Sequence, residues 1–133
     1  RNWDCFDAIV ATLRRDWKPT QVQAALDQVG LLRRENELPD RLSGGEQQRV
    51  GIARAIVGMP PVLLADEPTG NLDPDLSQEL FTLFGQLNGQ GTTVLIASHD
   101  LALIRSMGKR VLVLSDGRLV DDISADEVGG GRR

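Results

Sequence analysis

The sequence predicts an α/β protein with a parallel sheet and an antiparallel hairpin near its C-terminal end. Two short apolar runs, residues 62–65 and 92–98, have the composition of strands covered on both faces. Each run is followed by a helical pattern, and strands that alternate with helices usually form a parallel sheet. A third run, residues 111–115, precedes Asp116 and Gly117, a pair typical of type I′ turns. Residues 118–122 are therefore expected to fold back beside this third strand.

Two helices are predicted in the first forty residues. The first has an apolar face made by Phe6, Ile9, Val10 and Leu13. Pro19 is expected to interrupt the chain, and Thr20 with Gln23 has the pattern of a capping box that opens the second helix. Gly30 suits the position just beyond its end. The inward residues of this second helix are expected to be Val22, Ala25, Leu26 and Val29.

Three further helices follow from capping residues and apolar spacing. Ser43 is a good N-cap for a helix that should stop at Gly58. Asp73 followed by Pro74 matches an N-cap with proline at the first helical position. A short helix is expected around residues 101–107, and the glycine-rich tail is expected to be flexible. The expected inward residues are Val50, Ala53, Ile56 and Val57 in the first of these helices, and Leu76, Leu80, Leu83, Phe84 and Leu87 in the second.

Composition excludes several classes of protein. The 133 residues are 41% hydrophobic and 26% charged with a net charge of −4, and the basic residues form no concentrated stripe. A nucleic-acid-binding function is therefore not expected. No apolar stretch is long enough to span a membrane, and the first residues do not resemble a signal peptide. With the single Cys5 unable to form an internal disulfide, we expect a cytoplasmic protein, and the start at Arg1 suggests that the sequence begins within a longer chain.

The first candidate site is the start of the helix after Leu42, where Ser43, Gly44, Gly45 and Glu46 follow one another. Glycines allow backbone N–H groups to approach an anion, and the positive end of the helix dipole attracts negative charge. The Ser43 hydroxyl can donate to the same anion. The alternative is a serine-capped helix whose glycines serve only tight packing.

Two further candidate sites follow the predicted strands. Asp66 and Glu67 end the first strand, at the sheet edge where α/β proteins bind ligands. Asp66 could hold Mg²⁺ through water, and Glu67 could orient or deprotonate an attacking water. His99, the only histidine, follows the second strand and could hydrogen-bond a phosphate. The alternatives are an aspartate that caps the next turn and a histidine with a surface or structural role.

Taken in order, these stretches resemble the motifs of the ATP-binding-cassette (ABC) family. Residues 42–49 resemble its signature motif, residues 62–66 Walker B, and Glu67 the catalytic glutamate. Residues 70–73 resemble the D-loop, and His99 the switch histidine. The resemblance covers roughly residues 21–122 and implies a partial P-loop NTPase fold. Residues 4–40 would form a helical subdomain, residues 41–122 the catalytic portion and residues 123–133 a flexible tail.

The resemblance also implies a mechanism shared by two subunits. Family members dimerise head to tail around ATP, so Ser43, Gly44, Gly45 and Glu46 would contact nucleotide held by the other subunit. Asp66 would hold Mg²⁺, and Glu67 and His99 would act in catalysis. Asp73 would communicate across the dimer. Residues 65–73 are typical of the subgroup that works with mechanotransmitting or lipoprotein-handling membrane partners, which implies an integral membrane subunit and a place on the inner face of the plasma membrane.

One family motif is not found in the sequence. No Gly-x-x-x-x-Gly-Lys-Ser/Thr occurs in the 133 residues, so the loop that cradles the ATP phosphates is missing. We therefore expect ATPase activity in an intact protein and none in this chain alone. The alternatives are a non-catalytic module that offers its signature motif in trans and an ABC protein that works without a transporter. The absence of coiled-coil insertions and tandem cassettes argues against the latter.

Overall fold

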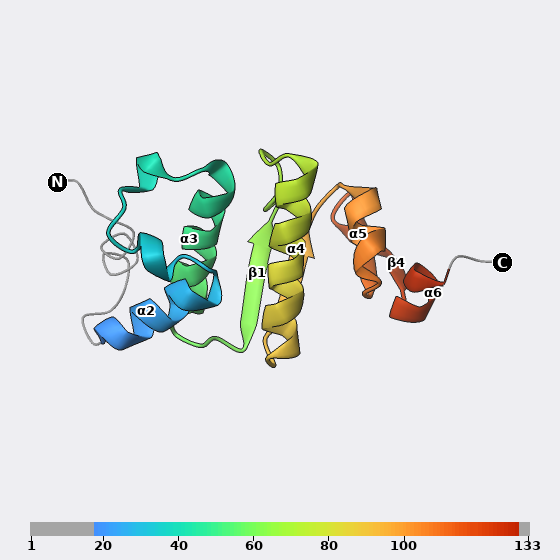
Figure 1. Ribbon diagram of the computed structural model, residues 1–133. Coiled ribbons are helices and arrows are strands. Elements are labelled where there is room, and N and C mark those ends of the chain that lie inside the picture. The colour runs from blue at the N-terminus through green and yellow to red at the C-terminus, as the bar shows by residue number, and fades with distance from the viewer. Residues whose placement is uncertain (1–17, 131–133) are drawn as a thin grey trace. The chain divides into compact units, whose positions relative to one another are not determined.

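The computed structural model describes residues 18–130, which divide into two compact units with the boundary in the chain between Ile96 and Ala97. Labels follow Figure 1. The first unit contains α2 (Pro19–Gln28), the 3₁₀ turns η1 (Leu32–Arg34) and η2 (Pro39–Arg41), α3 (Gly44–Ile56), β1 (Val62–Asp66), α4 (Pro74–Gly89) and β2 (Thr93–Ala97). The second contains α5 (Leu101–Met107), β3 (Val111–Ser115), β4 (Arg118–Ile123) and α6 (Ala125–Gly129). The helix predicted around residues 6–13 lies outside the described residues.

Helix α2 begins earlier than the sequence pattern predicted. Its N-cap is Lys18, whose backbone N–H donates to Gln21 Oε1 at 2.8 Å, and Pro19 occupies the first helical turn. The expected capping pair of Thr20 and Gln23 is therefore wrong, because proline is well tolerated at N1, where no N–H is needed. The end of the helix is as predicted, since Gly30 follows the C-cap with a φ of 76°.

The core of the first unit lies where α2, α3 and α4 pack against β1. All four inward residues predicted for α2 are buried, as are Ala53, Ile56 and Val57 of the α3 segment and Leu80, Leu83, Phe84 and Leu87 of α4. Ile52 and Phe81 are also buried, although the predicted faces did not include them. The rings of Phe81 and Phe84 meet edge to face with centroids 6.1 Å apart.

Within residues 18–130, strands β1 and β2 form a two-stranded parallel sheet that is covered on one face only. Leu63 is 5% exposed and packs into the core, whereas the neighbouring Val62 and Leu64 are 50% and 70% exposed. Leu95 of β2 is 56% exposed. The prediction of strands covered on both faces is therefore wrong for the described residues, because the helices α3 and α4 supply cover for one side alone. We call Val62, Leu64 and Leu95 the open face.

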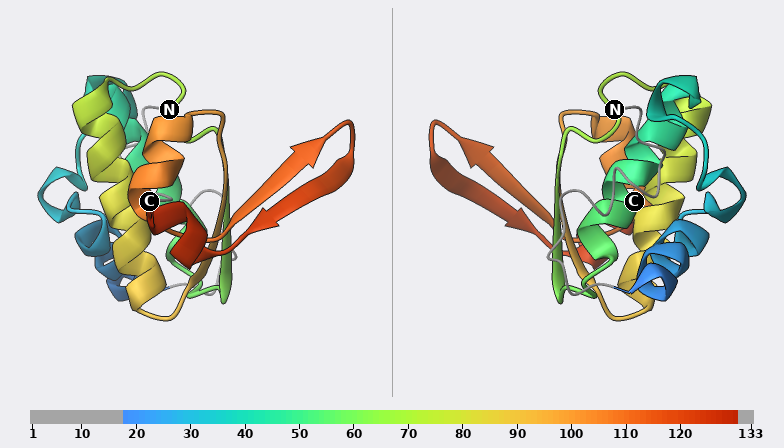
Figure 2. Two further views of the ribbon diagram at one scale, coloured as in Figure 1. Left: turned by 90° about the vertical axis from the view of Figure 1, so that its right-hand side faces the viewer. Right: turned by 90° about the vertical axis from the view of Figure 1, so that its left-hand side faces the viewer.

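The second unit is built around the predicted hairpin. Strands β3 and β4 pair antiparallel, with Val111 opposite Ile123 and a bulge between Val113 and Leu114 (Figure 2). The turn residues Asp116 and Gly117 have φ values of 49° and 74°, as a type I′ turn requires. The prediction of this turn is confirmed.

Two features differ from the expected organisation. The described strands form two separate two-stranded sheets, β1 with β2 and β3 with β4, rather than one continuous sheet. Within the segment expected to be flexible, Ser124 caps the short helix α6 by accepting from the N–H of Glu127 at 3.4 Å. None of the helices in residues 18–130 is long and apolar enough to cross a membrane.

Candidate functional site

The signature-like turn is built on the N-terminus of α3. Ser43 has extended backbone angles and its Oγ accepts from the N–H of Glu46 at 3.2 Å. Because the hydroxyl acts as acceptor in this bond, its own proton remains available to a ligand. The backbone N–H groups of Gly44 and Gly45 make no hydrogen bond within residues 18–130. This turn therefore offers several donors at the positive end of a helix, which suits an anion.

Glu46 completes the capping box of this helix. Its Oε1 accepts from the backbone N–H of Ser43 at 3.1 Å, and its Oε2 lies 3.5 Å from the guanidinium of Arg34. The hydrogen bond from the Ser43 backbone lowers the pKa of the Glu46 carboxyl, and the charges of Arg34 and Arg49 add smaller effects in the same direction. In the structure, Glu46 thus stabilises the conformation of the turn. Its predicted contact with nucleotide stays a prediction.

The carboxyl end of β1 carries the two predicted acidic residues. Asp66 is the last residue of the strand and is exposed. Glu67 follows with a φ of 45°, in the left-handed region that residues other than glycine rarely adopt. Its carbonyl accepts from the N–H of Gly70 at 3.2 Å, and the carbonyl of Thr69 accepts from Leu72 at 3.1 Å. These consecutive turns reverse the chain between β1 and α4.

The backbone conformation of Glu67 was not predicted from the sequence. Such conformations cost about 1–3 kcal/mol and gather at functional sites. The only local signal is Pro68, because a residue before proline is disfavoured in the right-handed helical region. This signal excludes a helical Glu67 without indicating the left-handed conformation.

Asp73 is the N-cap of α4, as predicted. Its Oδ1 accepts from the N–H of Leu76 at 2.9 Å, and Pro74 takes the first helical position. A cap of this kind satisfies one of the N–H groups that a helix start leaves unpaired. The role of Asp73 across a dimer stays a prediction.

Most of the predicted site residues share one end of the first unit. Figure 1 shows the start of α3, the end of β1 and the start of α4 at the same end. A Cβ atom on Gly44 would lie 3.6 Å from Leu72 Cδ2, so the first turn of α3 lies close beside the D-loop-like segment. His99 belongs to the second unit, between β2 and Asp100, the N-cap of α5. Its phosphate contact stays a prediction.

Metal binding at the candidate site would need ligands beyond the described side chains. In residues 18–130 no group of three or more His, Cys, Asp or Glu side chains could hold a metal ion by itself. Mg²⁺ often binds through one or two carboxylates together with waters and substrate phosphates. An exposed Asp66 at the sheet edge fits that mode of binding and does not fit an all-protein metal site.

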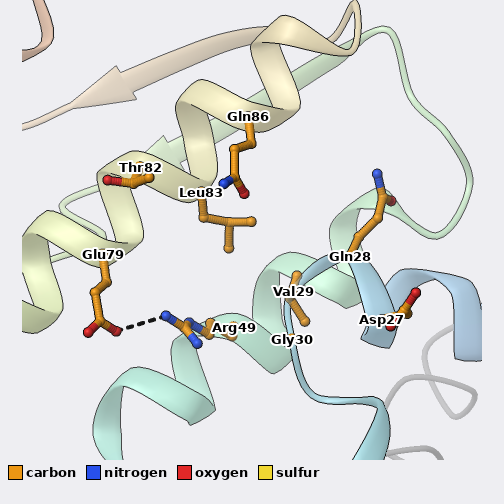
Figure 3. A pocket seen from close by; sticks show the side chains of 9 residues that line it. All are labelled: Asp27, Gln28, Val29, Gly30, Arg49, Glu79, Thr82, Leu83 and Gln86. Carbon is orange, nitrogen blue, oxygen red and sulfur yellow. Dashed lines mark hydrogen bonds and ion pairs between the residues drawn. The ribbon is translucent and has the colours of Figure 1, made fainter.

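A shallow groove of about 360 Å³ lies elsewhere in the first unit. It is formed by the end of α2 with Arg49 of α3 and Glu79 of α4, and none of the predicted site residues lines it (Figure 3). Arg49 and Glu79 pair across it at 3.0 Å. The groove is therefore not part of the candidate site.

Comparison with known proteins defines the class. The family model described as ABC transporter matches residues 4–70. The chain belongs to this family. It is 56% identical over 111 residues to the cell division ATP-binding protein FtsE of Escherichia coli K12, a match that covers 84% of this chain and 50% of that protein. The chain therefore spans about half the length of this curated relative.

Solved structures agree with the fold. CbiO1 of Clostridium perfringens, part of the ABC transporter complex cbiONQ, is 28% identical with a TM-score of 0.84, over 96% of this chain and 53% of that one. The bacterial ABC transporter cassette MJ0796, solved as a dimer, is 32% identical with a TM-score of 0.73, over 92% of this chain and 56% of that one. A second structure of MJ0796 contains ADP and Pi. The predicted α/β fold of the ABC ATPases is thus confirmed.

Proposed function

We propose that this chain is part of an ATP-hydrolysing ABC cassette of the FtsE type, the part with the signature turn and the Walker B carboxylates. The observation that carries the proposal is that the start of α3, the end of β1 and the start of α4 lie at one end of the first unit (Figure 1). These element ends carry Ser43, Asp66 with the following Glu67, and Asp73. The identity to FtsE supports a role in bacterial cell division. The sequence resemblance of residues 51–55 and 114–117 to FtsE points the same way.

The proposed roles follow from the chemistry of each group. Ser43 and the first-turn N–H groups donate to the γ-phosphate of ATP bound by a second cassette. Asp66 holds Mg²⁺ through water, and bound Mg²⁺ neutralises phosphate charge. Glu67 orients the attacking water, and His99 donates to the phosphate. In phosphoryl transfer, positioning and charge stabilisation of this kind supply most of the catalysis.

Two partners belong to the proposal. The first is a second ABC ATPase domain, for which the dimeric structure of MJ0796 is the support. The second is an integral membrane subunit like FtsX, which would bind mainly to the helical subdomain of residues 4–40. Through that subunit the protein would lie on the cytoplasmic, inner face of the plasma membrane.

We further propose that the chain alone does not turn over ATP. The 133 residues contain no Gly-x-x-x-x-Gly-Lys-Ser/Thr motif to hold the β- and γ-phosphates. The open face of Val62, Leu64 and Leu95 supports this view, because apolar strands of a parallel sheet are normally covered on both sides.

A titration of the purified chain with MgATP tests the proposed inactivity of the chain alone. Tryptophan fluorescence follows binding, and a phosphate assay follows hydrolysis. We expect no saturable binding in the micromolar range and no phosphate release. Micromolar binding with turnover that Glu67→Gln abolishes would contradict the proposal, because the chain would then hold the phosphates without the missing loop.

A second experiment tests the role of the signature turn in trans. E. coli FtsE whose signature serine is replaced by alanine is mixed with this chain and MgATP. We expect phosphate release to rise with the concentration of the chain, and Ser43→Ala in the chain to remove the increase. If the unaltered chain gives no increase, the proposed role of Ser43 is wrong.

Lipoprotein-release and macrolide-efflux ATPases are the alternative, because residues 65–73 are also typical of them. Affinity purification of the tagged chain from bacterial membranes that contain the candidate membrane subunits separates the possibilities. Recovery of FtsX supports the FtsE type. Recovery of a lipoprotein-release or macrolide-efflux subunit without FtsX supports the alternative.

A further inference from the structure

The first turn of α3 is in close contact with the first turns of α4. Gly45 is buried, and a Cβ atom built on it would lie 3.3 Å from Cδ2 of Leu76 and 3.5 Å from its Cδ1. Carbon atoms are best separated by about 3.5–4.0 Å, so any side chain at this position would press on Leu76. Leu76 therefore occupies the space that a side chain at position 45 would need.

A second contact joins the same two helices one turn further along. Arg49 donates to Glu79 Oε2 at 3.0 Å (Figure 3). Arg49 follows Gly45 by one helical turn, and Glu79 follows Leu76 by nearly one turn, so the two contacts lie on the same facing sides. The pair is partly exposed and adds little stability by itself, but it is consistent with one preferred alignment of the helices.

Leu76 is also held in place through its backbone. Its backbone N–H donates to Asp73 Oδ1 at 2.9 Å, which ties it to the D-loop-like segment. Leu72 of that segment packs against the hydrophobic core. Leu76 therefore links the cap of α4 to the start of α3, where Ser43 and its capping box are found.

We propose that Leu76 is a positioning residue for the signature turn, and that Gly45 must be glycine because Leu76 packs on it. The proposal rests on the proposed function, since the groups so placed are those expected to meet the phosphate. An alternative purpose for Gly45 is close approach of an anion to its N–H. The Cβ position of Gly45 lies against Leu76, so packing on Leu76 by itself disfavours a larger residue there whether or not an anion also approaches this N–H.

Thermal unfolding of four variants of the full chain tests the packing part. Gly51→Ala is the matched control, because Gly51 lies in the same helix and a Cβ atom there would meet nothing within 4 Å. Alanine is the better helix former, so this control is expected to raise the melting temperature. Gly45→Ala is expected to lower it. In a Leu76→Ala background, Gly45→Ala is expected to raise it as the control does.

Amide hydrogen exchange tests the positioning part. Leu76→Ala is expected to speed exchange at Glu46 and Gln47, whose N–H groups bond to Ser43, more than at Ala53 near the other end of α3. Leu76→Met should restore slow exchange, because methionine fills irregular space. Equal acceleration along the whole helix would show a purely structural role and overturn the proposal.

A rise in melting temperature for Gly45→Ala in the unaltered chain, equal to that for Gly51→Ala, would also overturn it. The proposal would also be overturned if Gly45→Ala changed the melting temperature equally in the unaltered chain and in the Leu76→Ala background. Neither measurement uses nucleotide. The MgATP experiments therefore test the proposed function, and these two measurements test the role of Leu76 independently.

Discussion

Leu63 and Leu64 are neighbours on β1 and provide a direct test of the one-sided sheet. Successive side chains of a strand point to opposite faces, and the two leucines are 5% and 70% exposed. Truncation of a buried leucine to alanine removes its packing and leaves a cavity, which costs about 2–5 kcal/mol. Truncation of an exposed leucine away from special features changes stability by about 0.5 kcal/mol or less. The same substitution should therefore give very different results at adjacent positions.

For Leu63→Ala we expect a loss of about 2–3 kcal/mol, near the lower end of that range. A strand that is covered on one face only can shift more easily into the space that the lost side chain leaves. For a chain of this length that loss lowers the melting temperature by roughly 8–12 °C. Leu64→Ala should change it by no more than about 2 °C. Circular dichroism during heating or urea titration measures both variants under identical conditions.

Equal destabilisation by the two variants would refute the one-sided sheet. It would mean that the open face is covered in solution. Repeating the measurement at several protein concentrations separates cover by a second copy, which depends on concentration, from cover within one chain.

Further outcomes are expected at three other places. Asp73→Ala should lower stability by about 1 kcal/mol through loss of the cap on Leu76, whereas Asp73→Asn should retain most of it, as thermal unfolding of the two variants would show. The pKa of Glu46 is lowered in the folded chain, so its carboxylate contributes stability above the ordinary value of 4.5, and that contribution is lost as the pH falls through the folded value. The melting temperatures of the unaltered chain and Glu46→Gln should therefore converge on acidification, and a constant gap would contradict this. Arg110 and Asp122 form an exposed bidentate pair, at 2.8 and 2.6 Å, so the small destabilisation expected from Asp122→Asn should vanish in about 1 M salt.

Two caps in the candidate site could be predicted from neighbouring residues, whereas one backbone conformation could not. Ser43 and Asp73 were predicted as N-caps because a capping side chain bonds to an N–H only two or three residues away. The left-handed conformation of Glu67 could not be predicted in this way. It depends on how the whole loop closes between β1 and α4, and glutamate has no intrinsic preference for it.

The sequence by itself determined the order of helices and strands from α2 to β4, the caps at Ser43 and Asp73, and the turn at Asp116 and Gly117. These features depend on residues within one or two turns of each other, so their physical causes are present in any short stretch of chain. Each site motif is likewise a short stretch of chain, and the order of these motifs indicated the ABC family.

Only the tertiary structure decided which face of β1 is open and what the glycines of the signature turn contact. A continuous apolar strand has the same sequence whether one face or both are covered, because the covering elements are distant in the chain. The contact of Gly45 with Leu76 and the pair of Arg49 with Glu79 likewise join separate helices. Such contacts follow from how amphipathic helices pack over the sheet, and no local pattern encodes that alignment.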